Sequence, residues 1–535
     1  RRVTSVEFRK FRFTDLHPGG HVRSFAEPSE RRVVSSGEFA KIPGQRLAYW
    51  ASETEWHALA ADRTIEAIAP ARQGVESGGK GEYVRFWWEV SRGRIGFDCA
   101  SVEDFHGQRF AFAPYLKGGE WRRWYGNDHH VIKFDSATYA ILLTVGNKLP
   151  SRDLYFKDVV TWSDISTKAF GARHAGTGSV FSALGPAALP STTSDRNLAM
   201  AVLNSAIGDR LLRLFGGTLH FNVGDVKTIP VPTVLNVDLR RRIDHHVEEL
   251  IDLHRADWLA FETSREFSGI PLVVGRPVRL EAAFREDSSY RDSCAARVAQ
   301  AEAALDDAVV LAFEAGSLPD RTLESTLRSG ATGDHAAKLA SELVSYGVGC
   351  MLGRYSLDVP GLIVADQGAT LEDYLATVPT PTFTPDADNV IPIVDGDWFE
   401  DDVVGLFRRF LRTAFGDQHF EENLKFVTES LGVKSLRDYF ITRAGKSKFY
   451  DDHVQRYKKR PIYWLFSSPK GSFNALIYLH RYTPSTVSTV LTYLREYVTK
   501  LESALQQADR AGNAKEADRL RKILVELNEY EHDTL

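Results

Sequence analysis

The stretch Tyr83-Val84-Arg85-Phe86-Trp87-Trp88 combines β-branched and aromatic residues, and a run of glycines precedes it. Residues of these types favour strands, and glycine clusters separate strands from one another. Residues 131–134 and 141–145 have the same character. We therefore predict a strand-rich region from about residue 46 to residue 165.

Helical patterns surround this region on its C-terminal side. Residues 195–214 keep apolar side chains at approximately helical spacing, with Asp195 as the predicted N-cap and Gly216-Gly217 as the stop. Apolar stripes also run through much of 236–350. The pattern predicts an α+β fold, in which a mixed α/β domain is followed by mainly α-helical domains.

At roughly 100–200 residues per domain, 535 residues suggest three or four domains. Arg-rich residues 1–45 are predicted to be an irregular linker, and residues 46–235 the mixed domain. Residues 236–375 follow as a helical domain and 376–396 as a Pro/Thr-rich linker. Residues 397–535 form a second helical domain, with a basic and aromatic segment at 453–482 and a helical hairpin at 484–531.

The charge balance excludes a uniformly basic nucleic-acid coat, since 66 Lys+Arg face 71 Asp+Glu. Residues 1–235 nevertheless carry 30 basic and 24 acidic side chains, and residues 441–481 carry 9 and 2. A polyanion would be held at these two places. Three cysteines favour a reducing compartment, so we expect a cytoplasmic protein, and no apolar run predicts a membrane span. Because Met first occurs at position 200, we expect the chain to begin inside a longer protein.

Enzyme signatures are weak. Residues 74–81 meet the pattern GxxxxGK, but Gly81 stands where a Ser or Thr would hold magnesium. The pairs His129-His130 and His245-His246 favour surface or capping roles over zinc, and Asp225-Val226-Lys227 has only the end of a magnesium nuclease triad. We therefore predict no catalytic, cofactor or metal site in this chain.

Three segments instead suit DNA recognition. Residues 114–127 mix Lys, Arg and Asn with Trp and Tyr, and Arg and Asn can read base edges while Lys and Arg contact phosphates. The alternative is a hairpin whose Trp121, Trp124 and Tyr125 pack into the core. Residues 161–174 add a glycine-containing loop. In residues 453–468, four basic residues precede the aromatic residues Tyr463, Trp464 and Phe466, which we expect in the core. Basic residues beside aromatic ones suit nucleic-acid binding. The alternative is that this run of charges is simply a solvated face.

These segments resemble a known family, the adenine-specific DNA methyltransferases of BREX phage defence (the PglX type). The resemblance spans residues 39–482 and is carried, in the family's order, by Phe39-Ala40-Lys41-Ile42-Pro43-Gly44, Trp87-Trp88-Glu89-Val90, Tyr115-Leu116-Lys117-Gly118-Gly119, Arg123-Trp124-Tyr125-Gly126-Asn127, Thr161-Trp162-Ser163-Asp164-Ile165-Ser166, Leu203-Asn204-Ser205, 219–230, Tyr346-Gly347-Val348-Gly349-Cys350, Gly353-Arg354-Tyr355-Ser356, 459–468 and Leu479-His480-Arg481-Tyr482.

The resemblance implies the C-terminal portion of an S-adenosylmethionine-dependent enzyme that methylates adenine at N6. The family's catalytic half carries an Asn-Pro-Pro-Tyr motif that holds the flipped adenine, but this sequence contains no Pro-Pro pair. The chain itself would hold no cofactor and would be inactive alone. Implied partners are double-stranded DNA, other BREX subunits and acidic DNA-mimic phage inhibitors, with no membrane.

On this interpretation the chain reads a short asymmetric DNA site. The predicted phosphate contacts are Lys117, Arg122, Arg123, Lys168, Lys458, Lys459 and Arg460. The predicted base-reading residues are Asn127, Ser163, Arg173 and His174. Two alternatives remain open: a protein-interaction scaffold that touches DNA incidentally, and a nuclease.

Overall fold

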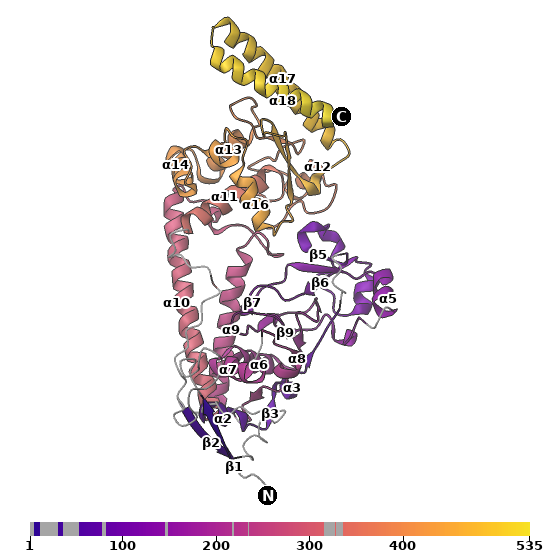
Figure 1. Ribbon diagram of the computed structural model, residues 1–535, viewed down its shortest axis with the longest axis vertical. Coiled ribbons are helices and arrows are strands. Elements are labelled where there is room, and N and C mark those ends of the chain that lie inside the picture. Colours follow the sequence, from indigo (N-terminus) through magenta and orange to yellow (C-terminus); the bar gives the residue numbers. More distant parts are fainter. Residues whose placement is uncertain are drawn as a thin grey trace, which may run out of the picture.

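The computed structural model describes residues 5–10, 30–35, 53–76, 82–144, 148–216, 219–233, 235–314, 327 and 335–534. It shows a mixed α and β protein with a helical C-terminal region, which confirms the predicted α+β class. The molecule is elongated, with the strand-containing N-terminal half at one end and the C-terminal helices at the other (Figure 1). Among the described residues, no helix combines the length and the apolar character that crossing a membrane requires.

Two small sheets form the strand-rich half. One has the order β4-β12-β9-β10-β7 and the other the order β11-β6-β8-β5. Their strands are β4 (Ala71–Arg72), β5 (Val84–Phe86), β6 (Phe112–Leu116), β7 (Trp124–Tyr125), β8 (His130–Lys133), β9 (Val159–Thr161), β10 (Arg173–Ala175), β11 (Val180–Phe181) and β12 (Ala187–Ala188). Because most strands have only two to four residues, long loops connect them and bring the candidate site residues together.

Four helices support the first sheet. Their bounds are α6 (Thr193–Asn204), α7 (Ala206–Gly216), α9 (Val237–Leu259) and α10 (Leu280–Ala312). Helix α6 is buried along most of its length, and α9 lies between it and α10, which runs along the side of the molecule (Figure 1). Helix α9 also contacts β7, so it packs directly against the segment at 114–127. Short elements complete this half: α2 (Glu53–Leu59), β3 (Arg63–Thr64), α3 (Ile65–Ile68), η3 (Trp87–Glu89), η4 (Arg92–Arg94), α4 (Val102–Gly107), α5 (Ser136–Thr144), η5 (Arg152–Leu154), α8 (Val223–Val226) and β13 (Pro230–Val231).

The C-terminal half packs helices around a three-stranded sheet of order β14-β16-β15. The elements are η6 (Pro271–Val273), α11 (His335–Met351), α12 (Leu371–Thr377), β14 (Ile391–Pro392), α13 (Val403–Phe415), α14 (Phe420–Leu431), α15 (Leu436–Phe440), α16 (Lys448–Arg456), β15 (Tyr463–Ser467), β16 (Asn474–Tyr478), η7 (Leu479–Arg481), α17 (Thr486–Arg510) and α18 (Ala514–Thr534). At the position of the predicted hairpin, 484–531, α17 and α18 pair and project from the body (Figure 1).

Several local predictions were wrong. Residues 141–144 belong to helix α5 (Ser136–Thr144), since Asp135 Oδ1 accepts the backbone N–H of Thr138 and so caps a helix that the apolar run alone did not reveal. The predicted helix at 195–214 is two helices, α6 and α7, which meet at Ser205. Its N-cap is Thr192, whose hydroxyl accepts the N–H of Asp195.

Two further differences concern the N-terminal segment and strand β15. Within the expected linker at 1–45, β1 (Ser5–Lys10) and β2 (Glu30–Ser35) form an antiparallel pair. The motif at 39–44 lies outside the described residues. Trp464, expected in the core, is 49% exposed, because it lies on the solvent side of the edge strand β15, whereas Tyr463 is buried and Phe466 partly buried.

Candidate nucleic-acid interface

Glycines in the loop between β6 and β7 allow its backbone to pack directly against the backbone of neighbouring loops. Gly118 has φ of 85°, and a Cβ there would lie 2.7 Å from the carbonyl oxygen of Leu184. Ser163 donates its hydroxyl to the carbonyl of Gly119 at 3.1 Å. These glycines therefore permit close packing between loops, and Ser163, predicted to read bases, is buried in that packing.

Arg122 and Arg123 do not face solvent, so their predicted phosphate contacts are not supported. Arg122 binds Asp257 at 2.8 Å, and its guanidinium lies 4.7 Å from the ring of Trp258 on α9. Arg123 is 1% exposed, and its Nη2 lies 2.7 Å from Oε1 of Glu302 on α10. The two arginines thus connect the segment at 114–127 to helices α9 and α10.

Arg173 is also a structural residue. It is 2% exposed, and its Nη1 donates to the carbonyls of Arg122 and Gly171, both at 3.4 Å. Burial, with Arg122 adding to it, lowers the pKa of Arg173 to about 10. A guanidinium enclosed in this way cannot reach a base edge without unfolding the loop, so the position of Arg173 does not suit the predicted base reading.

Asn127, which follows Gly126, closes the loop at 120–127 through its side-chain amide. Its φ is 65°, and its Nδ2 donates to the carbonyl of Glu120 at 2.6 Å. His174, the remaining predicted base reader, binds Asp158 at 2.7 Å and is partly buried. Neither side chain is turned toward solvent in a way that suits base reading.

We expect Asn127→Ala to destabilise the protein by about 1–3 kcal/mol, because the substitution removes the hydrogen bond from the buried Asn127 amide to the Glu120 carbonyl and places Ala at a positive φ. Thermal melting measures this effect. Asn127→Gly is the matched control, since glycine tolerates the backbone and isolates the lost hydrogen bond. A melting temperature equal to that of the parent chain would contradict the loop-closing role.

The basic residues at 458–460 lie beside the loop at 117–127, although several hundred residues separate the two in sequence. Lys458 Nζ lies 3.2 Å from Oε1 of Glu120, and the carbonyl of Arg460 accepts the indole N–H of Trp88 at 3.0 Å. All three basic side chains are exposed. Lys458 and Lys459, just after α16, have φ of 52° and 62°, which is uncommon for residues with side chains.

A cleft of about 590 Å³ lies where the two halves meet. Glu120, Arg122, Trp258, Arg456 and Lys458 are among the residues that line it. His129 lines it as well and is buried, which corrects its expected surface position; burial, with Lys458 and Arg122 nearby, lowers its pKa to about 3. The imidazole is therefore neutral, and both basic and acidic side chains surround it in the cleft.

An exposed aliphatic cluster, which we call the apolar tip, was missed in the sequence. It consists of Ile165, Leu184 and Leu219, each about half exposed. Backbone bonds join their loops: Asp164 N–H donates to the Leu184 carbonyl and Ser166 N–H to the Leu219 carbonyl, both at 3.0 Å. Single apolar residues in loops gave no sequence signal, because only the fold brings them together.

Two exposed lysines accompany the apolar tip. Lys117 precedes Gly118, whose backbone packs on Leu184, and Lys168 lies in the same loop as Ile165. Lys168 Nζ also lies 5.3 Å from the ring of Trp121. The loop at 117–127 thus extends from Leu184 of the apolar tip to Lys458, which contacts Glu120.

The weaker enzyme signatures find no support. A Cβ at Gly74 would lie 1.9 Å from the carbonyl oxygen of Phe181, so this glycine serves packing; residues 77–81 lie outside the described part of the chain. Asp225 is buried in α8 and accepts the side-chain amide of Asn222. That position is typical of a capping carboxylate rather than of an open magnesium site.

Comparison with known proteins finds relatives that match most of the chain. The adenine-specific methyltransferase BrxX of Escherichia coli O9:H4 (strain HS) is 31% identical over 537 aligned residues, which cover 92% of this chain and 43% of that protein. The adenine-specific methyltransferase PglX of Lacticaseibacillus casei (strain Zhang) is 31% identical over 495 residues, 88% of this chain and 39% of that protein. The chain thus spans about two-fifths of the length of these relatives.

No family model matches the chain. Among solved structures, the Type IIL restriction-modification enzyme MmeI in complex with DNA aligns with a TM-score of 0.30 and 12% identity, over 55% of this chain and 38% of that one.

Proposed function

Because the chain resembles part of the PglX-type adenine-specific methyltransferases, we propose that it is the DNA-binding, target-recognising portion of such an enzyme. In a BREX defence system, this portion would position a duplex so that a catalytic domain elsewhere in the protein reaches the adenine. S-adenosylmethionine would bind that other domain, and the whole protein would act in the cytoplasm.

The observation that carries the proposal is the meeting of two basic segments at one junction. Lys458 contacts the loop that also holds Lys117, and Lys459 and Arg460 extend the same exposed surface. Cations distributed along a surface neutralise phosphates and supply most of the non-specific DNA affinity. The positive φ values of Lys458 and Lys459 are consistent with this role, because strained backbone collects at functional sites.

The apolar tip would read the bases. The residues predicted for this role from the sequence are buried or partly buried: Asn127, Ser163, Arg173 and His174. Aliphatic side chains contact thymine methyl groups in the major groove, or wedge between base steps from the minor groove. Ile165, Leu184 and Leu219 are exposed, and Lys117 and Lys168 beside them would hold the backbone. The buried Arg122, Arg123 and Arg173 would keep the loops rigid.

Duplex binding at several salt concentrations tests the proposal. Fluorescence anisotropy with a labelled duplex should show binding whose log Kd rises linearly with log salt, with a slope near 0.9 for each phosphate contact. Binding that is absent at 50 mM salt would overturn the proposal. It would leave the protein scaffold as the better interpretation, with the projecting α17–α18 hairpin as the docking element for another subunit (Figure 1).

We also expect the 535-residue chain to bind no S-adenosylmethionine and to methylate no DNA. The reason for the first expectation is that the sequence has no convincing glycine-rich cofactor loop after a strand, and the reason for the second is that the family's adenine-binding motif needs a Pro-Pro pair, which the sequence lacks. Isothermal titration with the cofactor measures the first expectation, and transfer of a labelled methyl group the second. Saturable cofactor binding near one per chain would show that a catalytic site is present after all.

A further inference from the structure

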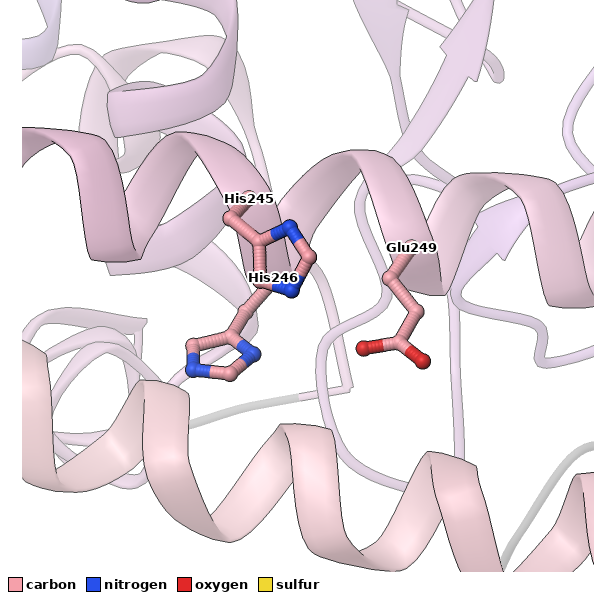
Figure 2. Close-up of side chains that lie close together, drawn as sticks. All are labelled: His245, His246 and Glu249. Atoms are coloured by element: carbon pink, nitrogen blue, oxygen red, sulfur yellow. The ribbon is translucent and has the colours of Figure 1, made fainter.

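One face of helix α9 brings together three side chains that suit a transition-metal ion. His245, His246 and Glu249 each offer a ligand atom, and these atoms all lie within 4.8 Å of one another. Figure 2 shows both imidazoles with ring nitrogens directed toward the Glu249 carboxylate, one turn farther along the helix. The spacing places Glu249 three and four residues after the histidines, and side chains at these spacings are neighbours on a helix.

The adjacent histidines argued against a metal in the sequence, because neighbouring residues on a helix diverge. The structure answers this objection through Glu249, which lies within reach of both rings. The two rings also lie close to each other, with centroids 5.3 Å apart. Rotation of the exposed His245 side chain, with small adjustments of the partly buried His246 and Glu249, can bring the ligands to the bond lengths of about 2.0–2.2 Å that zinc requires.

Each of the three groups is available for binding. Nδ1 of His246 is buried and has no hydrogen-bond partner among the described residues. Arg297 on α10 contacts Glu249, but its Nη2 at 2.7 Å and its Nε at 3.2 Å both bind Oε1. Oε2 can therefore accept a metal while Arg297 orients the carboxylate.

We propose that His245, His246 and Glu249 form a binding site for one divalent transition-metal ion, with Zn²⁺ as the natural probe. Two imidazoles and one carboxylate form a ligand set that zinc and similar ions accept, with water completing the coordination. The ion would bind on the surface of α9, beside Arg297 of α10. The site is independent of the proposed DNA-binding role, because none of its three ligands belongs to the surface described above.

The test is a Zn²⁺ titration of the tag-free, metal-stripped 535-residue chain by calorimetry. We expect one site per chain, and His245→Ala should weaken binding at least about tenfold, since even loss of an outer-shell partner costs 10- to 100-fold. His245 is exposed, so this variant should fold normally. His532→Ala, which removes an exposed histidine from α18, is the matched control and should bind like the parent chain.

Two more variants sharpen the result. Glu249→Gln should weaken binding by a similar factor, and Arg297→Gln should also weaken it, because Arg297 orients the Glu249 carboxylate. Replacing Zn²⁺ with Co²⁺ should give visible absorption bands that disappear in His245→Ala. Absence of saturable Zn²⁺ binding in the parent chain, or equal affinity in the parent and in His245→Ala, would overturn the site.

Discussion

Replacing Glu302 with Ala is expected to lower the free energy of unfolding by about 3–5 kcal/mol, which is typical when one partner of a buried ion pair is removed. Arg123 is 1% exposed and contacts both carboxylate oxygens of Glu302, and Trp124 Nε1 donates to the same carboxylate at 2.9 Å. The substitution leaves a buried guanidinium and a buried indole N–H without their acceptor. Thermal and urea melting measure the change.

Glu516→Ala is the matched control, because Glu516 pairs with Arg519 at the surface and exposed pairs contribute about 0–1 kcal/mol. The double variant Arg123→Met, Glu302→Leu should be much more stable than Glu302→Ala, since no charge is then left buried. It should also keep the DNA affinity of the parent. A double variant that folds but loses DNA affinity would show that Arg123 contacts phosphates after all.

The second large effect concerns DNA affinity. Changing Lys458, Lys459 and Arg460 to Gln should weaken binding to all duplexes alike, and each lost phosphate contact should flatten the log–log salt slope by about 0.9. By that slope, with 1 M salt as the reference, each contact contributes about fivefold at 0.15 M salt. Gln keeps an unbranched polar side chain at all three positions, so the positive-φ backbone at residues 458 and 459 should stay intact.

A triple variant of the α17–α18 hairpin provides the charge-matched control. Arg510, Lys515 and Lys522 are exposed there, and their change to Gln removes the same three charges far from the junction. Its salt slope should equal that of the parent chain. If both triple variants lose the same affinity, net charge rather than contact at the junction explains the binding.

The sequence predicted element types well where patterns were long. The helices within 236–350 and the α17–α18 hairpin follow from sustained apolar periodicity. Short apolar runs failed, as at 141–145, because four or five residues fit a strand and a helix equally well. In the structure, Asp135 caps a helix here by accepting the backbone N–H of Thr138, and the apolar run does not reveal this hydrogen bond.

The candidate site was predicted less well, for a physical reason. An arginine beside tryptophans resembles a phosphate ligand until its partner is known, and Asp257 and Glu302 lie 135 and 179 residues away in sequence. The apolar tip had no pattern at all, because three separate loops supply one side chain each. Lys117, Lys168 and the cations at 458–460 remain as proposed contacts, since their exposure agrees with that role.

Selection from a randomised duplex library tests the central claim most directly. The 535-residue chain should enrich one short asymmetric sequence, and a variant with Ile165, Leu184 and Leu219 changed to Ser should bind DNA without that preference. Because these side chains are about half exposed, the variant should melt near the parent temperature. If the parent chain binds duplexes but enriches no sequence, it does not recognise a target, and the proposed target-recognition function is wrong.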